Sequence, residues 1–199
     1  MKRASGGEEK VLFSRGLFHL LATSAWSSDG KTILFFGVDD RPGGSSSVDV
    51  YALSMTGGTV TNLVRGAGAA TSLGAVFSPD GHWFAYQSNE SGNFEVYVQP
   101  FPPTGEKWQV SSNHGGGPQW RGDGRELFFG TNGAVVSVDI DTKGRFNAGA
   151  TKPLFPLPPR ATNAVVTPDG QRFLIGVPAD DEPMTSFTVV LNWSEGLKY

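Results

Sequence analysis

Four aspartates recur in the same setting along the chain, and a carboxylate is a group that can transfer protons or bind a metal. Asp29, Asp80, Asp123 and Asp169 each precede a glycine, at separations of 51, 43 and 46 residues. An aspartate followed by glycine is typical of a tight turn, because the carboxylate bonds the nearby backbone and glycine adopts a positive φ. We therefore predict that these four residues form turns, spread over successive repeats rather than gathered in one site.

Two further acidic groups could support chemistry. Asp39 and Asp40 are adjacent, and Asp180, Asp181 and Glu182 form a run near the C-terminal end. Glycoside hydrolysis uses two carboxyl groups about 5–10 Å apart beside a pocket. If these two groups met at the mouth of a channel, the chain could be a glycan- or peptide-processing enzyme or its accessory domain.

Metal and cofactor motifs have little support. Residues 139–144 resemble the start of a calcium loop, but Lys143 and Ala150 stand where that loop needs an oxygen ligand and a glutamate. The three histidines, His19, His82 and His114, lack zinc-site spacing, and there is no G-x-S-x-G nucleophile motif. We expect neither a metal, nor a cofactor, nor catalytic residues.

The turns lie within repeats of alternating apolar and polar residues, which is the pattern of β-strands. Repeats extend over about residues 17–64, 73–110, 118–155 and 164–193, and the last lacks a fourth strand. A period of 40–50 residues with four strands and no amphipathic helix predicts an all-β fold, a β-propeller of about four antiparallel four-stranded blades. We predict a flexible arm over residues 1–8 and a single propeller domain over residues 9–199.

The ends of the chain leave two interpretations open. Residues 10–13 could pair with residues 187–191 and close a four-bladed ring, which would remove an exposed strand edge. Alternatively, the chain is part of a larger ring, and its exposed flanks would then favour self-association. For the core, we predict large apolar residues of the central strands, namely Phe77, Phe84, Tyr86, Phe94, Val96, Leu127, Phe128, Val135, Phe173 and Val190. The five tryptophans are mostly core candidates as well.

Composition restricts the classes of partner. The net charge is −3 and the pI is about 5.6, which argues against nucleic-acid binding. There is no cysteine, no apolar stretch long enough to span a membrane and no visible signal peptide. The compartment is not determined by the sequence: it is the cytoplasm for the chain as given, or the periplasm if the chain belongs to a longer membrane-anchored protein.

The repeats resemble a known family. The stretch FSPDGHWFAYQSNESGNFEVYVQPF is similar to the WD40-like (PD40) repeat of TolB-type proteins. The segment KWQVSSNHGGGPQWRGDGRELFF and the ending FTVVLNWSEGLKY are similar to the C-terminal propellers attached to bacterial serine/threonine protein kinases. The resemblance covers about residues 26–198, although Ser28 and Gly122 replace the turn proline. It implies a sensing or protein-binding module, and kinase activity is not implied because no kinase motif is present.

Propeller geometry predicts where a ligand would bind. If the first strand of each blade lines the channel, the Asp–Gly turns lie on one face, and the remaining loops gather on the other face. Loops on a rigid scaffold commonly carry binding residues. Our candidates on this face are Asp39, Arg41, Arg65, Glu90, Asn93, Asn113, His114, Arg160, Asn163 and Asp181. We expect a non-catalytic binding, scaffold or sensor module that recognises a protein or a small ligand there.

Overall fold

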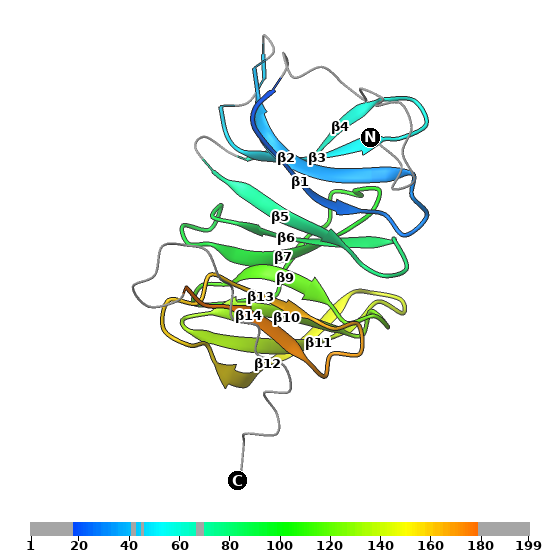
Figure 1. Cartoon of the computed structure of the whole chain (residues 1–199). Coiled ribbons are helices and arrows are strands. Elements are labelled where there is room, and N and C mark those ends of the chain that lie inside the picture. Colours follow the sequence, from blue (N-terminus) through cyan, green and yellow to red (C-terminus); the bar gives the residue numbers. More distant parts are fainter. Residues whose placement is uncertain (1–17, 41–42, 45, 67–69, 179–199) are drawn as a thin grey trace, which may run out of the picture.

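The computed structural model describes residues 18–40, 43–44, 46–66 and 70–178, and all regular elements within these ranges are β-strands. The strands form three four-stranded antiparallel sheets and one two-stranded sheet. Each sheet is a blade; the three four-stranded blades follow one another down the view in Figure 1, and the two-stranded blade overlaps the lowest of them in this view. The predicted all-β architecture of antiparallel four-stranded blades is confirmed.

Consecutive strands pair with each other within every blade. Blade 1 contains β1 (Phe18–Trp26), β2 (Thr32–Asp39), β3 (Asp49–Ser54) and β4 (Val60–Val64). Blade 2 contains β5 (Ser72–Phe77), β6 (Trp83–Ser88), β7 (Glu95–Pro100) and β8 (Trp108–Gln109). Blade 3 contains β9 (Gly116–Trp120), β10 (Glu126–Thr131), β11 (Ala134–Asp141) and β12 (Asn147–Pro156). Blade 4 contains β13 (Asn163–Val166) and β14 (Phe173–Gly176).

Each blade begins with a hairpin closed by an Asp–Gly turn. The four turn glycines, Gly30, Gly81, Gly124 and Gly170, have φ between 71° and 74°. Only glycine adopts this left-handed conformation at little cost, so the turn chemistry fixes where each inner strand reverses. Because the turns recur at the same point of each blade, they lie on one face, which we call the turn face. The opposite face, with the second-to-third-strand loops and the blade-joining loops, is called the loop face.

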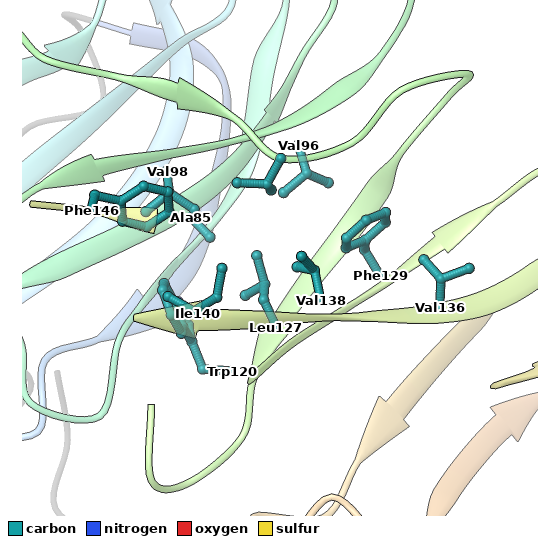
Figure 2. Packing of buried hydrophobic residues seen from close by; sticks show 11 residues of the cluster. Ala85, Val96, Val98, Trp120, Leu127, Phe129, Val136, Val138, Ile140 and Phe146 are labelled. Atoms are coloured by element: carbon teal, nitrogen blue, oxygen red, sulfur yellow. The ribbon is translucent and has the colours of Figure 1, made fainter. Parts of the chain in front are cut away.

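Apolar side chains hold successive blades together. Between blades 1 and 2, Leu34 and Val50 pack against Phe84 and Tyr86. Between blades 2 and 3, Ala85, Val96 and Val98 face Leu127, Phe129 and Val138, as Figure 2 shows. Phe128, Val135 and Phe155 of blade 3 meet Phe173 of blade 4. Strands of blades 2 and 3 are therefore covered on both faces, which explains their nearly continuous apolar sequences.

Two core predictions are wrong. Phe94 is 37% exposed because β7 begins only at Glu95, so Phe94 belongs to the preceding loop and not to the alternating strand. Trp26 is 50% exposed, whereas Trp120, in the same place before the turn, is buried against blade 2. Trp26 ends β1 in the first blade, and the described residues include no preceding blade for it to pack against.

Most of the other predicted core residues are buried. Phe84, Tyr86, Val96, Leu127, Phe128, Val135 and Phe173 are buried, and Phe77 is partly buried against the first junction. Val190 lies outside the described residues, as do the arm over residues 1–8 and both segments of the proposed ring closure. Ring closure therefore stays a prediction. Within the described part of the chain, no helix is long and apolar enough to cross a membrane.

Candidate functional site

The turn aspartates are engaged in the turns that they form. The carboxylates of Asp29, Asp80, Asp123 and Asp169 each accept a bond, 3.0 Å long in every case, from the backbone N–H two residues later. The hydroxyls of Ser27, Ser78 and Thr167 donate hydrogen bonds to three of these carboxylates. In blade 3 the Arg121 guanidinium donates to Asp123 instead. The predicted structural role of these carboxylates is confirmed.

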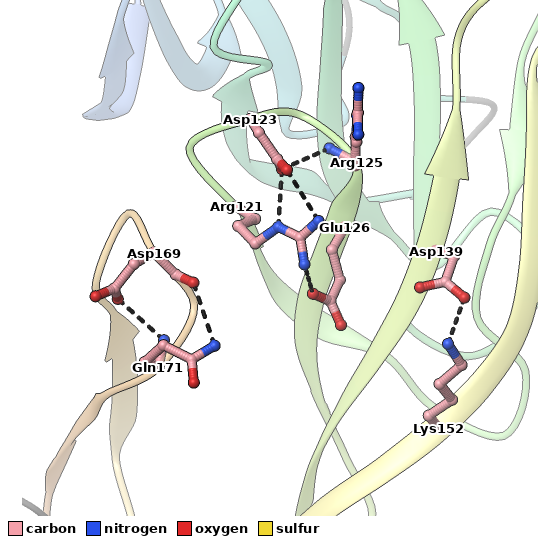
Figure 3. Close-up of polar contacts among 8 residues, drawn as sticks. All are labelled: Arg121, Asp123, Arg125, Glu126, Asp139, Lys152, Asp169 and Gln171. Carbon is pink, nitrogen blue, oxygen red and sulfur yellow. Dashed lines mark hydrogen bonds and ion pairs between the residues drawn. The ribbon is translucent and has the colours of Figure 1, made fainter.

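The turn of blade 3 carries the strongest electrostatic effect. The Arg121 guanidinium bonds both oxygens of Asp123, at 2.8 and 2.9 Å, and also Glu126 at 2.6 Å (Figure 3). Donation from Arg121, together with the Arg125 backbone N–H, lowers the pKa of Asp123 to about 2. At neutral pH this carboxylate is therefore ionised and occupied, which does not suit it to act as a general base.

A polar groove of about 780 Å³ lies on the turn face between blades 2 and 3. Its wall includes Asp80, Trp83, Asp123, Arg125, Asp141 and Lys143. Asp139, also in the wall, pairs with Lys152 (Figure 3). Asp141 accepts the Lys143 backbone N–H at 2.9 Å, as a turn residue does. Among the described residues, no group of three or more His, Asp or Glu side chains is placed to hold a metal.

On the loop face, the predicted site residues do not form one cluster. Asp39 is a buried residue at the end of β2, so its assignment to an exposed ligand loop is wrong. Glu90 pairs with Lys107, and Arg65 and Asn93 are exposed on separate loops. Arg41 and Asp181 lie outside the described residues.

The blade-joining loops carry the other candidates in unusual backbone conformations. Asn113 and His114 have φ of 66° and 70°, and Arg160 has φ of 64°. Non-glycine residues seldom adopt this region, so the loops are held by specific bonds. The Asn113 carbonyl accepts bonds from Thr131 at 3.1 Å and Asn132 at 2.7 Å, which attaches this loop to blade 3.

Two buried carboxylates anchor the chain where it leaves the first two blades. Asp49 begins β3 and accepts bonds from the Asn62 amide at 2.8 Å and the Gly66 N–H at 2.9 Å. Glu95 begins β7 and accepts bonds from the His114 N–H at 3.0 Å and from the Ser111 hydroxyl. The sequence pattern predicts strands at both positions but not their bonds, because the bonded groups lie 13 to 19 residues further along the chain.

A cavity of about 400 Å³ lies at the loop-face end of the inner strands, between blades 3 and 4. Its apolar wall contains Phe128, Val135, Leu157 and Phe173. Polar groups at its boundary come from Gln87, Gln119, Thr162 and Asn163. Of the predicted site residues that the structure describes, Asn163 alone lines this cavity.

Two glutamines bridge neighbouring blades beside the cavity. The Gln87 side-chain oxygen accepts the Gly117 N–H at 2.7 Å, which links β6 to β9. The Gln119 amide bonds the Ala164 carbonyl at 2.5 Å and the Val166 N–H at 3.0 Å, which links β9 to β13. The sequence gives little sign of these roles, since a lone glutamine in a strand usually faces solvent.

The lining of this cavity is mainly apolar, with a few uncharged polar groups. No Asp, Glu, His, Lys or Arg is present among the described residues that line it. Apolar walls with a few amide and hydroxyl groups are typical of sites that bind a ligand through shape and a small number of hydrogen bonds. General acid–base catalysis, in contrast, requires a titratable group within reach of the substrate.

Comparison with known proteins places the fold. No protein-family model matches the chain. An uncharacterized protein of Agrobacterium fabrum is 31% identical over 72 residues, which are 36% of this chain and 22% of that protein. TolB from Acinetobacter baumannii superposes with a TM-score of 0.67 and 20% identity, over 90% of this chain and 43% of TolB. The fold is a TolB-like β-propeller.

Other propellers of different function are also similar. An oligogalacturonate lyase in complex with manganese has a TM-score of 0.65 and 15% identity, over 97% of this chain and 54% of the lyase. The β-propeller domain of the Trilobed protease from Pyrococcus furiosus has a TM-score of 0.55 and 13% identity, over 88% of this chain and 53% of that domain. The chain spans about half the length of these structures. At such identities the likeness shows the fold and not the activity.

Proposed function

We propose that this chain is a non-catalytic binding module and that its ligand site is the loop-face cavity between blades 3 and 4. The observation that carries the proposal is the lining itself: an apolar wall around Phe128 and Phe173, bounded by the amides of Gln119 and Asn163. Packed blades hold both sides of the cavity, so its shape is set before a ligand arrives, which favours binding.

The proposed role within a larger protein is recognition of a protein or a small ligand. The resemblance of the repeats to propellers attached to bacterial serine/threonine kinases supports a sensor or scaffold role. TolB-like propellers are structural neighbours, which is compatible with such a role. Reading the coding sequence beside this chain for a kinase or membrane-anchor segment tests the kinase association directly.

The enzymatic alternative has weaker support. Asp39 is buried at the end of β2, and Asp40 pairs with His19. The acidic run over residues 180–182 lies outside the described residues. The turn-face groove contains carboxylates, but those of Asp80, Asp123 and Asp141 accept bonds from their own turns. Within the described ranges, no two carboxylates form a converging pair that the geometry favours as catalytic.

The test is a protein-observed NMR titration of the intact chain with a panel of neutral, acidic and basic small molecules and short peptides. We expect ligand-dependent shifts of the Gly116, Gly117, Gly130 and Asn163 amides. Shifts confined to the turn-face groove would contradict the proposal. Turnover of a glycan or peptide that is lost on replacing an aspartate by asparagine would establish an enzyme instead.

A further inference from the structure

One position on the second strand of blades 1, 2 and 3 faces the following blade, and its occupant explains the cavity. Seven residues after the turn aspartate stand Phe36 in blade 1, Gln87 in blade 2 and Gly130 in blade 3. The same position in blade 4 is Gly176, which has no following blade among the described residues. Side chains alternate along a strand, so these residues share a face with Leu34, Ala85 and Phe128, which pack on the next blade. The first two positions carry a large side chain, and the third carries none.

In blade 2 the side chain at this position fills the junction. Gln87 reaches across to blade 3 and accepts the Gly117 N–H at 2.7 Å. Gly116 permits this approach, since a Cβ built there would lie 2.6 Å from the Gln87 side-chain oxygen. The junction between blades 2 and 3 is thus closed at its loop-face end by one amide.

In blade 3 the corresponding glycine is not demanded by the backbone. A Cβ at Gly130 would meet only the Gly116 carbonyl oxygen, at 3.7 Å, which is an ordinary contact. The φ of Gly130 is not positive, so its backbone conformation is open to other residues. A side chain could therefore stand here, as in blades 1 and 2. The cavity of about 400 Å³ is the space beside Gly130 that such a side chain would enter.

We propose that this space receives an uncharged aromatic side chain, with its neighbouring peptide amides, from a partner protein. The inference rests on the proposed binding function and names the chemistry of its ligand. Phe173 already makes edge-to-face contacts with Phe128 and Phe155, at ring-centroid distances of 5.4 and 5.0 Å. An added ring can extend this cluster, because aromatic rings favour such contacts.

Charge and size restrict the ligand further. A charged group would be buried without a counter-charge among the described lining residues, which is costly. The volume is near the lower end of the range of about 300–1,000 Å³ found for ligand pockets, which suits one large side chain rather than a long chain. Thr162 and Asn163 in the lining offer polar groups to the flanking peptide bonds. The Asn163 amide can donate, and the Thr162 oxygen, whose proton is directed at the Gly176 carbonyl at 3.2 Å, can accept.

The experiment uses N-acetyl-tryptophanamide as the probe and N-acetyl-tryptophan, which carries a carboxylate, as its charged counterpart. Binding to the intact chain is followed by NMR shifts of the Gly117 and Asn163 amides. We expect the neutral probe to bind and the charged probe to bind at least about tenfold more weakly.

Two substitutions at one position provide the matched variants. Gly130→Gln should fill the space as Gln87 fills the preceding junction, and should weaken probe binding by about tenfold or more. Gly130→Ala adds one methyl group and should change binding by less than about threefold. Unchanged circular dichroism and an unchanged or raised Tm would show that both variants fold.

Three results would overturn the inference: equal binding of the two probes, equal binding by the Gly130→Gln variant, or no binding of the neutral probe. If another ligand of the NMR panel shifts the cavity amides while the neutral aromatic probe does not, the aromatic assignment fails and the binding site stands. If no ligand shifts them, both the inference and the proposed function fail.

Discussion

Two neighbouring junctions of this propeller, between blades 2 and 3 and between blades 3 and 4, are built from the same kind of strands and filled differently. At the first, Val96, Val98, Leu127 and Val138 have no exposed surface, and Gln87 closes the loop-face end. At the second, the loop-face end is hollow around Gly130. One junction thus contributes mainly stability, and the other leaves room for a ligand.

The chain segments that join the blades at these two junctions are also held with different strength. The loop from blade 2 to blade 3 is bonded to the buried Glu95 carboxylate. The corresponding first residue of the third strand in blade 3 is Ala134, and the chain leaving that blade is held by a Leu157 N–H bond to the Gly133 carbonyl, at 2.6 Å. A charged acceptor makes stronger hydrogen bonds than a neutral carbonyl, so the first connection is held more firmly.

The largest difference between the junctions should appear when a leucine is truncated at each. Leu127→Ala, in the filled junction, should lower the free energy of unfolding by about 2–5 kcal/mol, because it leaves a void among packed side chains. Leu157→Ala, in the wall of the existing cavity, should cost less, since Leu157 is only partly buried. Denaturant unfolding of both variants measures this. Equal losses would show that the two junctions are equally packed.

The next largest effect should come from the anchor of the first connection. Glu95→Ala leaves the His114 N–H and the Ser111 hydroxyl without their acceptor. Ser111 is buried, and a buried hydroxyl left unpaired costs about 1–3 kcal/mol, whereas the N–H of exposed His114 can bond water. Glu106→Ala, at an exposed position, is the control and should have little effect. A Glu95→Ala protein as stable as the control would mean that the loop is held by its other bonds.

A smaller effect is expected from Gln87→Leu, which keeps the volume at the loop-face end but removes the acceptor of the Gly117 N–H. The bond is exposed, so its loss should cost only about 0.5–1.5 kcal/mol. Hydrogen exchange provides a local readout, because the Gly117 amide should lose protection while amides in β10 keep theirs. Unchanged protection of Gly117 would show that the glutamine bridge does not close this junction.

The sequence predicted the fold better than the site for a physical reason. An Asp–Gly turn depends on local backbone conformation, which each repeat determines by itself. The four turns therefore predicted the positions of the hairpins correctly. Phe94 was placed wrongly because alternation alone cannot tell where a strand begins. Trp26 was placed wrongly because its burial depends on a neighbouring blade and not on its own strand.

The cavity could not have been predicted from the residue types that usually indicate function. Its decisive feature is an absent side chain at Gly130, and a glycine in a strand has several explanations. Aligning the repeats on their turn aspartates would have set Gly130 beside Phe36 and Gln87, with Gly176 in the last repeat, and that alignment is a weak sequence signal. Most of the predicted polar loop residues lie on separate loops, since sequence indicates the face on which a residue lies but not its neighbours there.

The smallest expected effect concerns the turns that border the two junctions. Arg121 holds the Asp123 turn beside the filled junction, whereas the Asp169 turn of blade 4 relies on the Thr167 hydroxyl and the Gln171 N–H. The bond from Arg121 lowers the pKa of Asp123 to about 2, and the bonds from Thr167 and Gln171 lower the pKa of Asp169. Arg121→Gln should therefore raise the pKa of Asp123 toward its ordinary value and leave that of Asp169 unchanged.

Carbon-detected NMR titration of the two carboxyl groups measures both values in one sample, so Asp169 is the internal control. The folded-state pKa is depressed, so the stabilisation from Asp123 is complete above its unfolded-state pKa near 4 and is lost as the pH falls toward 2. Because the Asp123 side chain is about half exposed, solvent screens the pair and the change in stability should be small. If the pKa of Asp123 stayed near 2 in the Arg121→Gln protein, the backbone bond from Arg125, rather than the guanidinium, would be what holds this turn.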